Sequence, residues 1–137
     1  MAENFLKWDP NLYGVNIATM DAEHKQLVEY MNQLHTNVEN KASKAILQKS
    51  LTDLFNYTLK HFKDEEELFK KIPNYSFKNA HVKIHEDLIA KLKTYAATFE
   101  KTGTFPPDFF VFLKVWLTAH IAGIDMKYSN ALYNKAA

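Results

Sequence analysis

The stretch that decides the fold is Leu54–Phe69, which reads LFNYTLKHFKDEEELF. It continues a pattern of core-like positions at alternating intervals of four and three residues, the spacing that keeps one face of a helix towards its neighbours. The positions on this face are Leu47, Leu51, Leu54, Thr58, His61, Glu65 and Leu68. An ionised carboxylate buried without a partner costs several kcal/mol, so something must compensate at His61 and Glu65.

The rest of the chain has the same helical character. With 3 Gly and 4 Pro in 137 residues, and no long β-branched alternation, the sequence predicts an all-α protein. Short connections between long helices favour an up-down-up-down antiparallel four-helix bundle, with helices crossing near ~20°. We expect one domain over 1–137, with an N-terminal arm at 1–18 that carries Trp8, and a bundle over 19–134. The predicted helices cover roughly 19–38, 43–71, 76–100, and a stretch from Pro106 or Pro107 to about 127 or beyond.

Local signals mark the helix boundaries. Ser43 and Ser76 are suited to N-cap the second and third helices, because a serine hydroxyl accepts a hydrogen bond from a free backbone N–H of the first turn. Pro73 prevents the second helix from continuing. Pro106 or Pro107 suits the first position of the fourth helix, where no N–H is needed.

Every predicted helix carries histidine on its inner face. In an antiparallel bundle, the starts of the first and third helices meet the ends of the second and fourth. The histidines lie near those termini, so five of them can converge at one end of the bundle. These five are His24, His61, His81, His85 and His120. Of the six histidines, only His35 stands off the inner face.

The spacing of these residues suits metal binding. His61 with Glu65, and His81 with His85, are i, i+4 pairs that stack on one helix face about a turn apart. His120 and Asp125 are five residues apart, which an ideal helix does not place on one face. We therefore expect the fourth helix either to widen locally to an i→i+5 turn or to loosen near its end.

The donor set exceeds what one ion needs. Five imidazoles and two carboxylates are too many for one ion, whereas two ions bridged by Glu65 and Asp125 use them all. Imidazole with carboxylate suits iron, zinc, copper, nickel or manganese. Two six-coordinate irons with a further solvent bridge would keep about one position open, where O₂ could bind. Taken singly, each histidine is better explained as a hydrogen-bonded core residue, but seven polar groups at one level of a core favour a metal centre.

The composition excludes several other classes. The chain has 17 basic and 16 acidic residues, a formal net charge of +1, and no basic stripe, so we expect no nucleic-acid partner. No cysteine is present, which excludes disulfides and thiolate-bound metal. No apolar run is long enough for a signal peptide or a membrane span, so we expect a cytoplasmic protein without membrane insertion.

The ordered motifs resemble those of the hemerythrin family, in particular a single-domain bacterial member. They are DAEHK at His24, HFKDE at His61 and Glu65, HVKIH at His81 and His85, and WLTAHIAGIDMKY at His120 and Asp125. The resemblance implies a non-haem di-iron site with an oxo or hydroxo bridge. One iron would be held by His81, His85 and His120, and the other by His24 and His61, with Glu65 and Asp125 bridging.

The resemblance also implies a function. O₂ would bind reversibly at the iron held by two histidines, in a protein that carries, stores or delivers oxygen to a recipient that the sequence does not identify. The apolar residues expected to line the O₂ pocket are Leu27, Phe62, Trp116, Leu117 and Ile121. The alternatives are a di-iron enzyme of oxidase or peroxidase type, or an O₂- or iron-sensing module. Because histidines outnumber carboxylates five to two, unlike in ferritin-like oxidases, we expect no enzyme.

Overall fold

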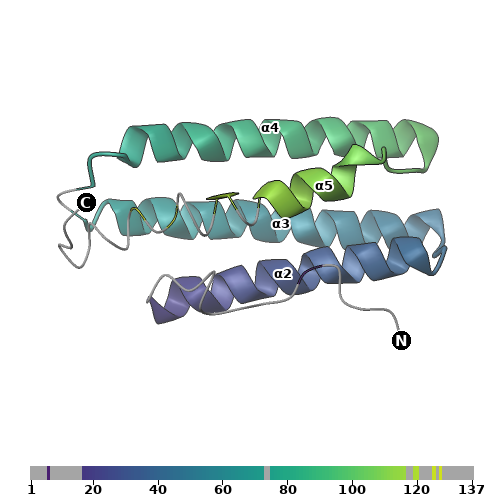
Figure 1. The fold of residues 1–137 in the computed structure, drawn as a ribbon, viewed down its shortest axis with the longest axis horizontal. Coiled ribbons are helices and arrows are strands. Elements are labelled where there is room, and N and C mark those ends of the chain that lie inside the picture. Colours follow the sequence, from purple (N-terminus) through teal and green to yellow (C-terminus); the bar gives the residue numbers. More distant parts are fainter. Residues whose placement is uncertain are drawn as a thin grey trace.

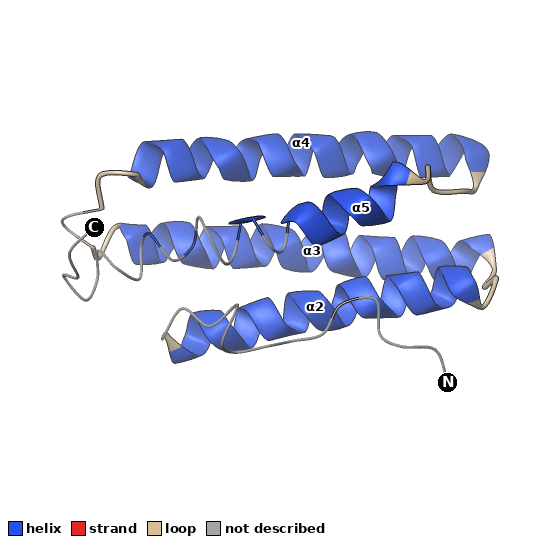
Figure 2. Ribbon diagram, in the orientation of Figure 1, coloured by secondary structure: helices blue, strands red, loops and turns tan. Residues whose placement is uncertain are grey.

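The computed structural model describes residues 6, 17–72, 75–116, 119, 120, 125 and 127. This part of the chain contains helices and no strand, and successive helices run antiparallel beside one another (Figures 1 and 2). The α-helices are α2 (Ala18–Glu39), α3 (Lys44–Phe69), α4 (Lys78–Thr102) and α5 (Asp108–Val115). The expected all-α four-helix bundle is confirmed. Most of the expected N-terminal arm, including Trp8, lies outside the described residues.

The helix boundaries follow local chemistry with two exceptions. Ser43 caps α3 as predicted, since its hydroxyl accepts a hydrogen bond from the Ile46 N–H at 3.3 Å. The prediction for Ser76 was wrong, because α4 begins two residues later and Phe77 occupies the N-cap position without a side-chain bond. The prediction that Pro106 or Pro107 takes the first position of the fourth helix was also wrong, because α5 begins at Asp108 and Pro107 occupies its N-cap position. Gly103 ends α4 with a left-handed φ of 72°, a conformation that glycine adopts without a steric penalty.

The fourth helical segment changes its geometry beyond α5. The described residues Trp116, Ala119, His120 and Asp125 have π-helical backbone, and Lys127 is again α-helical. Of the two alternatives predicted from the His120–Asp125 spacing, the structure therefore adopts the i→i+5 turn. A π-helix has a wider turn, and it brings residues five apart towards one face.

The apolar core lies on both sides of the polar residues of the bundle. A large cluster includes Leu34, Leu54 and Phe99 and occupies the end where α2 stops and α3 starts. A small cluster of Met20, Phe69, Ile72 and Tyr75 occupies the opposite end. Phe69, rather than the predicted Leu68, is the last buried residue of α3, whereas Leu68 is only partly buried.

None of the described helices has an apolar run long enough to cross a membrane. The buried histidines of α2, α3 and α4 and the buried Glu65 lie towards the small cluster along each helix, and they interrupt the apolar core at one level.

Candidate metal centre

The seven predicted ligand residues come together at this level. α2 supplies one of them, α3 two, α4 two, and the π-helical segment two. All are buried, and none is more than 4% exposed. They are His24, His61, Glu65, His81, His85, His120 and Asp125.

The ligand atoms form two groups that share both carboxylates. Within each group, one nitrogen or oxygen atom per residue lies within 4.8 Å of the others. One group consists of Glu65, His81, His85, His120 and Asp125. The other consists of His24, His61, Glu65 and Asp125. An arrangement in which two acids belong to both groups is suited to two neighbouring cations with bridging carboxylates.

Asp125 connects three helical segments through its two oxygens. Its Oδ1 lies 2.9 Å from His81 Nε2 and 3.0 Å from His120 Nε2, and its Oδ2 lies 2.9 Å from His24 Nε2. Two of the facing nitrogens, His81 Nε2 and His120 Nε2, are only 3.4 Å apart. His81 of α4 and His120 of the π-helical segment thus present their Nε2 atoms to the same carboxylate oxygen.

Glu65 likewise contacts histidines of α2, α3 and α4 through its two oxygens. Its Oε1 lies 3.1 Å from His85 Nε2 and 3.5 Å from His61 Nε2, and its Oε2 lies 3.3 Å from His24 Nε2. His24 therefore contacts both carboxylates. It belongs to the ligand group with two histidines, whereas the other group has three.

Several of these atoms are close together without forming hydrogen bonds. Both oxygens of Asp125 and the Nε2 atoms of His61 and His85 are buried and have no aligned hydrogen-bond partner. Buried polar atoms normally have partners, and those that lack one need an explanation. Buried nitrogen and oxygen atoms that converge at short range without aligned hydrogen bonds fit a bound metal ion, so the residues present fit the predicted cofactor.

The charges at the centre also favour cations. Burial raises the pKa of Glu65, but the surrounding histidines outweigh this effect and lower it to about 2. Burial likewise raises the pKa of Asp125, whereas the contact with His120 and the other histidines holds it well below its usual range. Burial lowers the pKa of His24, yet Asp125 and Glu65 raise it to about 10. Two ionised acids in a dry interior need compensating positive charge.

In three of the histidines, the Nδ1 atom, which faces away from the centre, contacts a polar side chain. His61 Nδ1 lies 2.8 Å from Glu23 Oε1, and His85 Nδ1 lies 2.9 Å from Glu66 Oε2. His81 Nδ1 lies 2.6 Å from the hydroxyl of Tyr75. When Nδ1–H donates to these groups, the Nε2 lone pair faces the centre, as a metal ligand requires.

The sequence analysis did not identify these outer partners. Glu23, Glu66 and Tyr75 have no helical spacing that distinguishes them from surface residues. For the two glutamates, the only signal is adjacency in the sequence: Glu23 precedes His24 and Glu66 follows Glu65. Which imidazole each of them reaches depends on how the helices pack.

The described apolar residues predicted to line an O₂ pocket are buried. Leu27, Phe62 and Trp116 belong to the large core cluster. The Phe62 ring stacks on His85 with 3.8 Å between centroids and lies 5.9 Å from the ring of Trp116. The other two predicted pocket residues, Leu117 and Ile121, lie outside the described residues.

His35 lies away from the centre, as predicted. Its Nδ1 is 3.2 Å from Glu39 Oε1, and its ring contacts Phe110 edge-on at 4.8 Å between centroids. It belongs to neither of the two ligand groups.

Comparison with known proteins gives consistent results. A sequence model described as "Hemerythrin HHE cation binding domain" matches residues 15–132. The bacteriohemerythrin of Pseudomonas aeruginosa is 34% identical over 127 residues, which cover 93% of this chain and 81% of that protein. The myohemerythrin of Riftia pachyptila is 34% identical over 125 residues, which cover 91% and 92%. A solved wild-type hemerythrin structure superposes with a TM-score of 0.82 at 26% identity, covering 93% of this chain and 97% of that chain.

Proposed function

Because the chain belongs to the hemerythrin family, we propose that it binds O₂ reversibly at a non-haem di-iron centre and carries, stores or delivers oxygen. The observation that carries this proposal is the pair of buried ligand groups that share Glu65 and Asp125. Such sharing suits two metal ions better than one.

The ligand assignment is part of the proposal. His81, His85 and His120 would hold one iron, and His24 and His61 the other. Glu65 and Asp125 would bridge the pair together with an oxo or hydroxo group. When bound, the iron pair supplies an open coordination position and the electrons needed to hold O₂ reversibly.

The chain's own residues would keep the binding reversible. Leu27, Phe62 and Trp116 are buried beside the ligands and exclude water from them. A dry surrounding disfavours charge separation, and it would slow the loss of reduced oxygen to solvent. We propose that Leu117 and Ile121 complete the same apolar wall.

The donor set supports a carrier rather than an enzyme. Ferritin-like di-iron proteins build their centres largely from glutamates on four helices, with one histidine in each Glu-x-x-His motif. Here five histidines accompany two carboxylates. This histidine-rich donor set differs from that of the ferritin-like oxidases, and the difference favours a carrier.

Repeated oxygenation tests the proposal. Protein loaded with ferrous iron is exposed to air, and the visible charge-transfer band is followed while oxygen is removed and readmitted several times. A carrier restores the band in each cycle. Irreversible bleaching in the first cycle, with peroxide released to solution, would instead support the oxidase or peroxidase alternative.

A further inference from the structure

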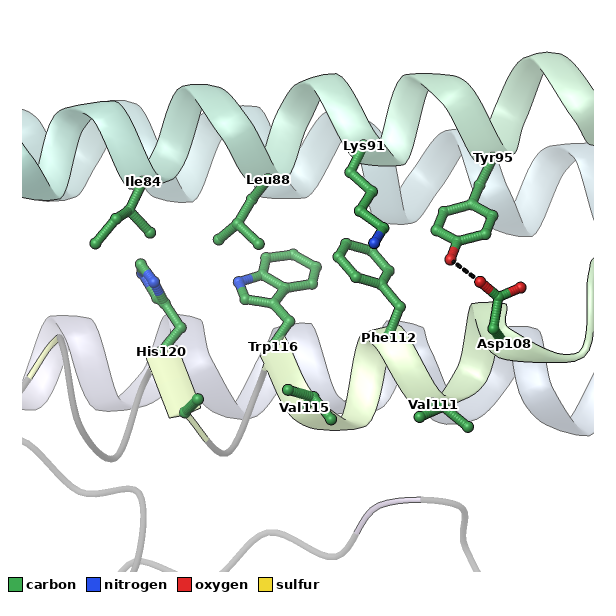
Figure 3. A pocket seen from close by; sticks show the side chains of 11 residues that line it. Ile84, Leu88, Lys91, Tyr95, Asp108, Val111, Phe112, Val115, Trp116 and His120 are labelled. Atoms are coloured by element: carbon green, nitrogen blue, oxygen red, sulfur yellow. Dashed lines mark hydrogen bonds between the residues drawn. The ribbon is translucent and has the colours of Figure 1, made fainter.

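A groove of about 480 Å³ runs between α4 and the fourth helical segment, and of the candidate ligands only His120 lines it (Figure 3). Side chains of α4 face side chains of α5 and its extension across this groove. Its apolar walls include Ile84, Leu88, Val111, Phe112, Val115 and Trp116. The volume lies within the range of small-molecule sites, which are mostly apolar with a few polar groups.

The apolar wall of this groove is unusually open to solvent. Val111 is 62% exposed and Val115 56%, and they are the most exposed large apolar side chains among the described residues. They are four residues apart on α5, so they form a continuous ridge on one side of the groove. Contiguous exposed apolar surface in a groove is typical of a binding site.

The groove is lined by one carboxylate and one lysine, and among the described residues only the carboxylate has a polar partner. The Tyr95 hydroxyl donates a hydrogen bond of 2.8 Å to Asp108 Oδ2 at one end of the groove (Figure 3). The Lys91 ammonium instead lies over the ring of Phe112, 5.3 Å from its centroid. No carboxylate in the described part of the chain forms an ion pair with Lys91.

The local sequence explains why Lys91 has no carboxylate partner. Several other lysines in the bundle pair with an acid one turn away, as Lys49 does with Asp53. The acid one turn before Lys91 is Asp87, and it is paired with Lys83 at 2.6 Å. The groove therefore offers a cation, held against an aromatic face, to whatever occupies it.

We propose that this groove binds an organic anion with an apolar body, such as an unbranched aliphatic carboxylate. Its acid group would pair with Lys91, and its chain would lie along Leu88 and Ile84, past Trp116 and towards His120. Ile84 and Lys91 are seven residues apart, about 10 Å along the helix axis, which matches an extended chain of about eight carbons.

Occupation of the groove would affect the metal centre. The groove ends at His120, whose Nε2 faces Asp125 in the candidate centre. A bound chain would pack against His120 and Trp116 from the outside. The resulting change in oxygen affinity rests on the proposed function, whereas binding itself does not.

Calorimetric titration of the iron-loaded protein with sodium octanoate tests the proposal. We expect a saturable signal from about one octanoate per chain. Each methylene removed from the chain should weaken binding by about fourfold, so hexanoate should bind about 16-fold more weakly. Neutral octanamide should also bind more weakly than octanoate. The titration can be done without O₂, so a saturable signal supports the groove site whether or not the protein proves to be an oxygen carrier.

Two matched lysine variants locate the site. Lys91→Gln should weaken octanoate binding by about fivefold, as expected for the loss of an exposed ion pair. Lys93→Gln is the control, because Lys93 is exposed on the same helix and lines a different groove. Val115→Asp should weaken binding as well, since it adds a negative charge to the exposed ridge.

Three outcomes would overturn the proposal. The first is the absence of a saturable signal, and the second is equal affinity in Lys91→Gln and Lys93→Gln. The third is direct ligation of iron by the carboxylate, recognised by a changed iron spectrum with octanoate but no binding of octane-1-sulfonate. Self-association that Val115→Asp abolishes, without octanoate binding, would identify a second copy of the chain as the occupant.

Discussion

Three imidazoles of the candidate centre are held by a polar contact at each ring nitrogen. His61, His81 and His85 turn Nε2 towards the shared acids and Nδ1 towards Glu23, Tyr75 and Glu66. The outer contact fixes both the tautomer and the ring orientation. Without the contact at Nδ1, the imidazole would stay near the centre, but its Nε2 atom would be less well oriented towards the shared acids.

The Glu66–His85 contact can be tested with adjacent residues. Glu66→Leu should reduce metal affinity by about 10- to 100-fold, because His85 loses the group that orients it. Glu67→Leu should have little effect, since Glu67 is exposed and paired with Lys70. Competition for iron with a chelator of known affinity measures both variants. Equal losses would show that the effect comes from surface charge rather than from the hydrogen bond.

The ligand assignment can be tested with two histidines. His85→Ala should abolish two-iron stoichiometry, because it removes a nitrogen that contacts Glu65 directly. His35→Ala should keep the full iron content, since His35 belongs to neither ligand group. Iron analysis of the purified variants gives the answer. Iron loss in His35→Ala with full loading of His85→Ala would mean that the ligands have been misassigned.

Each helix contributes its ligands through its own periodicity. α3 and α4 present i, i+4 pairs on an ordinary α-helical face, whereas the last segment needs a π-helical turn to present His120 and Asp125. π-helical turns are rare and are often found at functional sites. The last segment therefore needs a local change of helix geometry to bring its two candidate ligands together, while the other helices need none.

The start of α3 gives a prediction about stability. Ser43→Ala should lower the free energy of unfolding by about 1 kcal/mol, because the Ile46 N–H loses its side-chain acceptor. Ser76→Ala is a matched control, since Ser76 does not cap α4. Urea denaturation of the metal-loaded variants compares them. A larger loss in Ser76→Ala would contradict the observed start of α4.

In the bundle as a whole, many of the residues that stabilise the fold lie apart from the candidate metal ligands. Its large apolar cluster occupies one end, and the polar ligands lie between this cluster and the small one. Core residues at the far end can therefore be altered without disturbing the ligands.

Leu34 offers a test of this separation. It lies ten residues beyond His24, about 15 Å along α2, and is fully buried. Leu34→Ala should cost about 2–5 kcal/mol of stability through lost burial and a cavity, yet keep the full iron content. Thermal unfolding and iron analysis measure the two effects. Loss of iron from a folded variant would show that the two parts are coupled.

Removal of the metal should affect the whole molecule. Without cations, the ionised Glu65 and Asp125 must be accommodated by histidines alone, so chelation should lower the melting temperature. At free metal about 1,000 times above its dissociation constant, binding adds about 4 kcal/mol of stability. Calorimetry with and without chelator measures the shift. An unchanged melting temperature would exclude tight binding at this centre.

The sequence alone determined the helical class, the antiparallel order and the seven residues that converge. These follow from apolar spacing, from short connections and from the position of each histidine along its helix. The Ser43 cap and the widened turn at His120–Asp125 were predictable for the same reason, because each depends on neighbours close in the chain.

Only the tertiary structure decided which side chains support the ligands and where the open groove lies. Glu23 of α2 contacts His61 of α3. Lys91 has no acidic partner among the described residues, because Asp87 pairs with Lys83. The false prediction at Ser76 has the same origin, since the loop before α4 is set by the packing of Tyr75 against Phe69 and His81. Such contacts depend on the relative rotation and height of packed helices, which periodicity within a single helix does not specify.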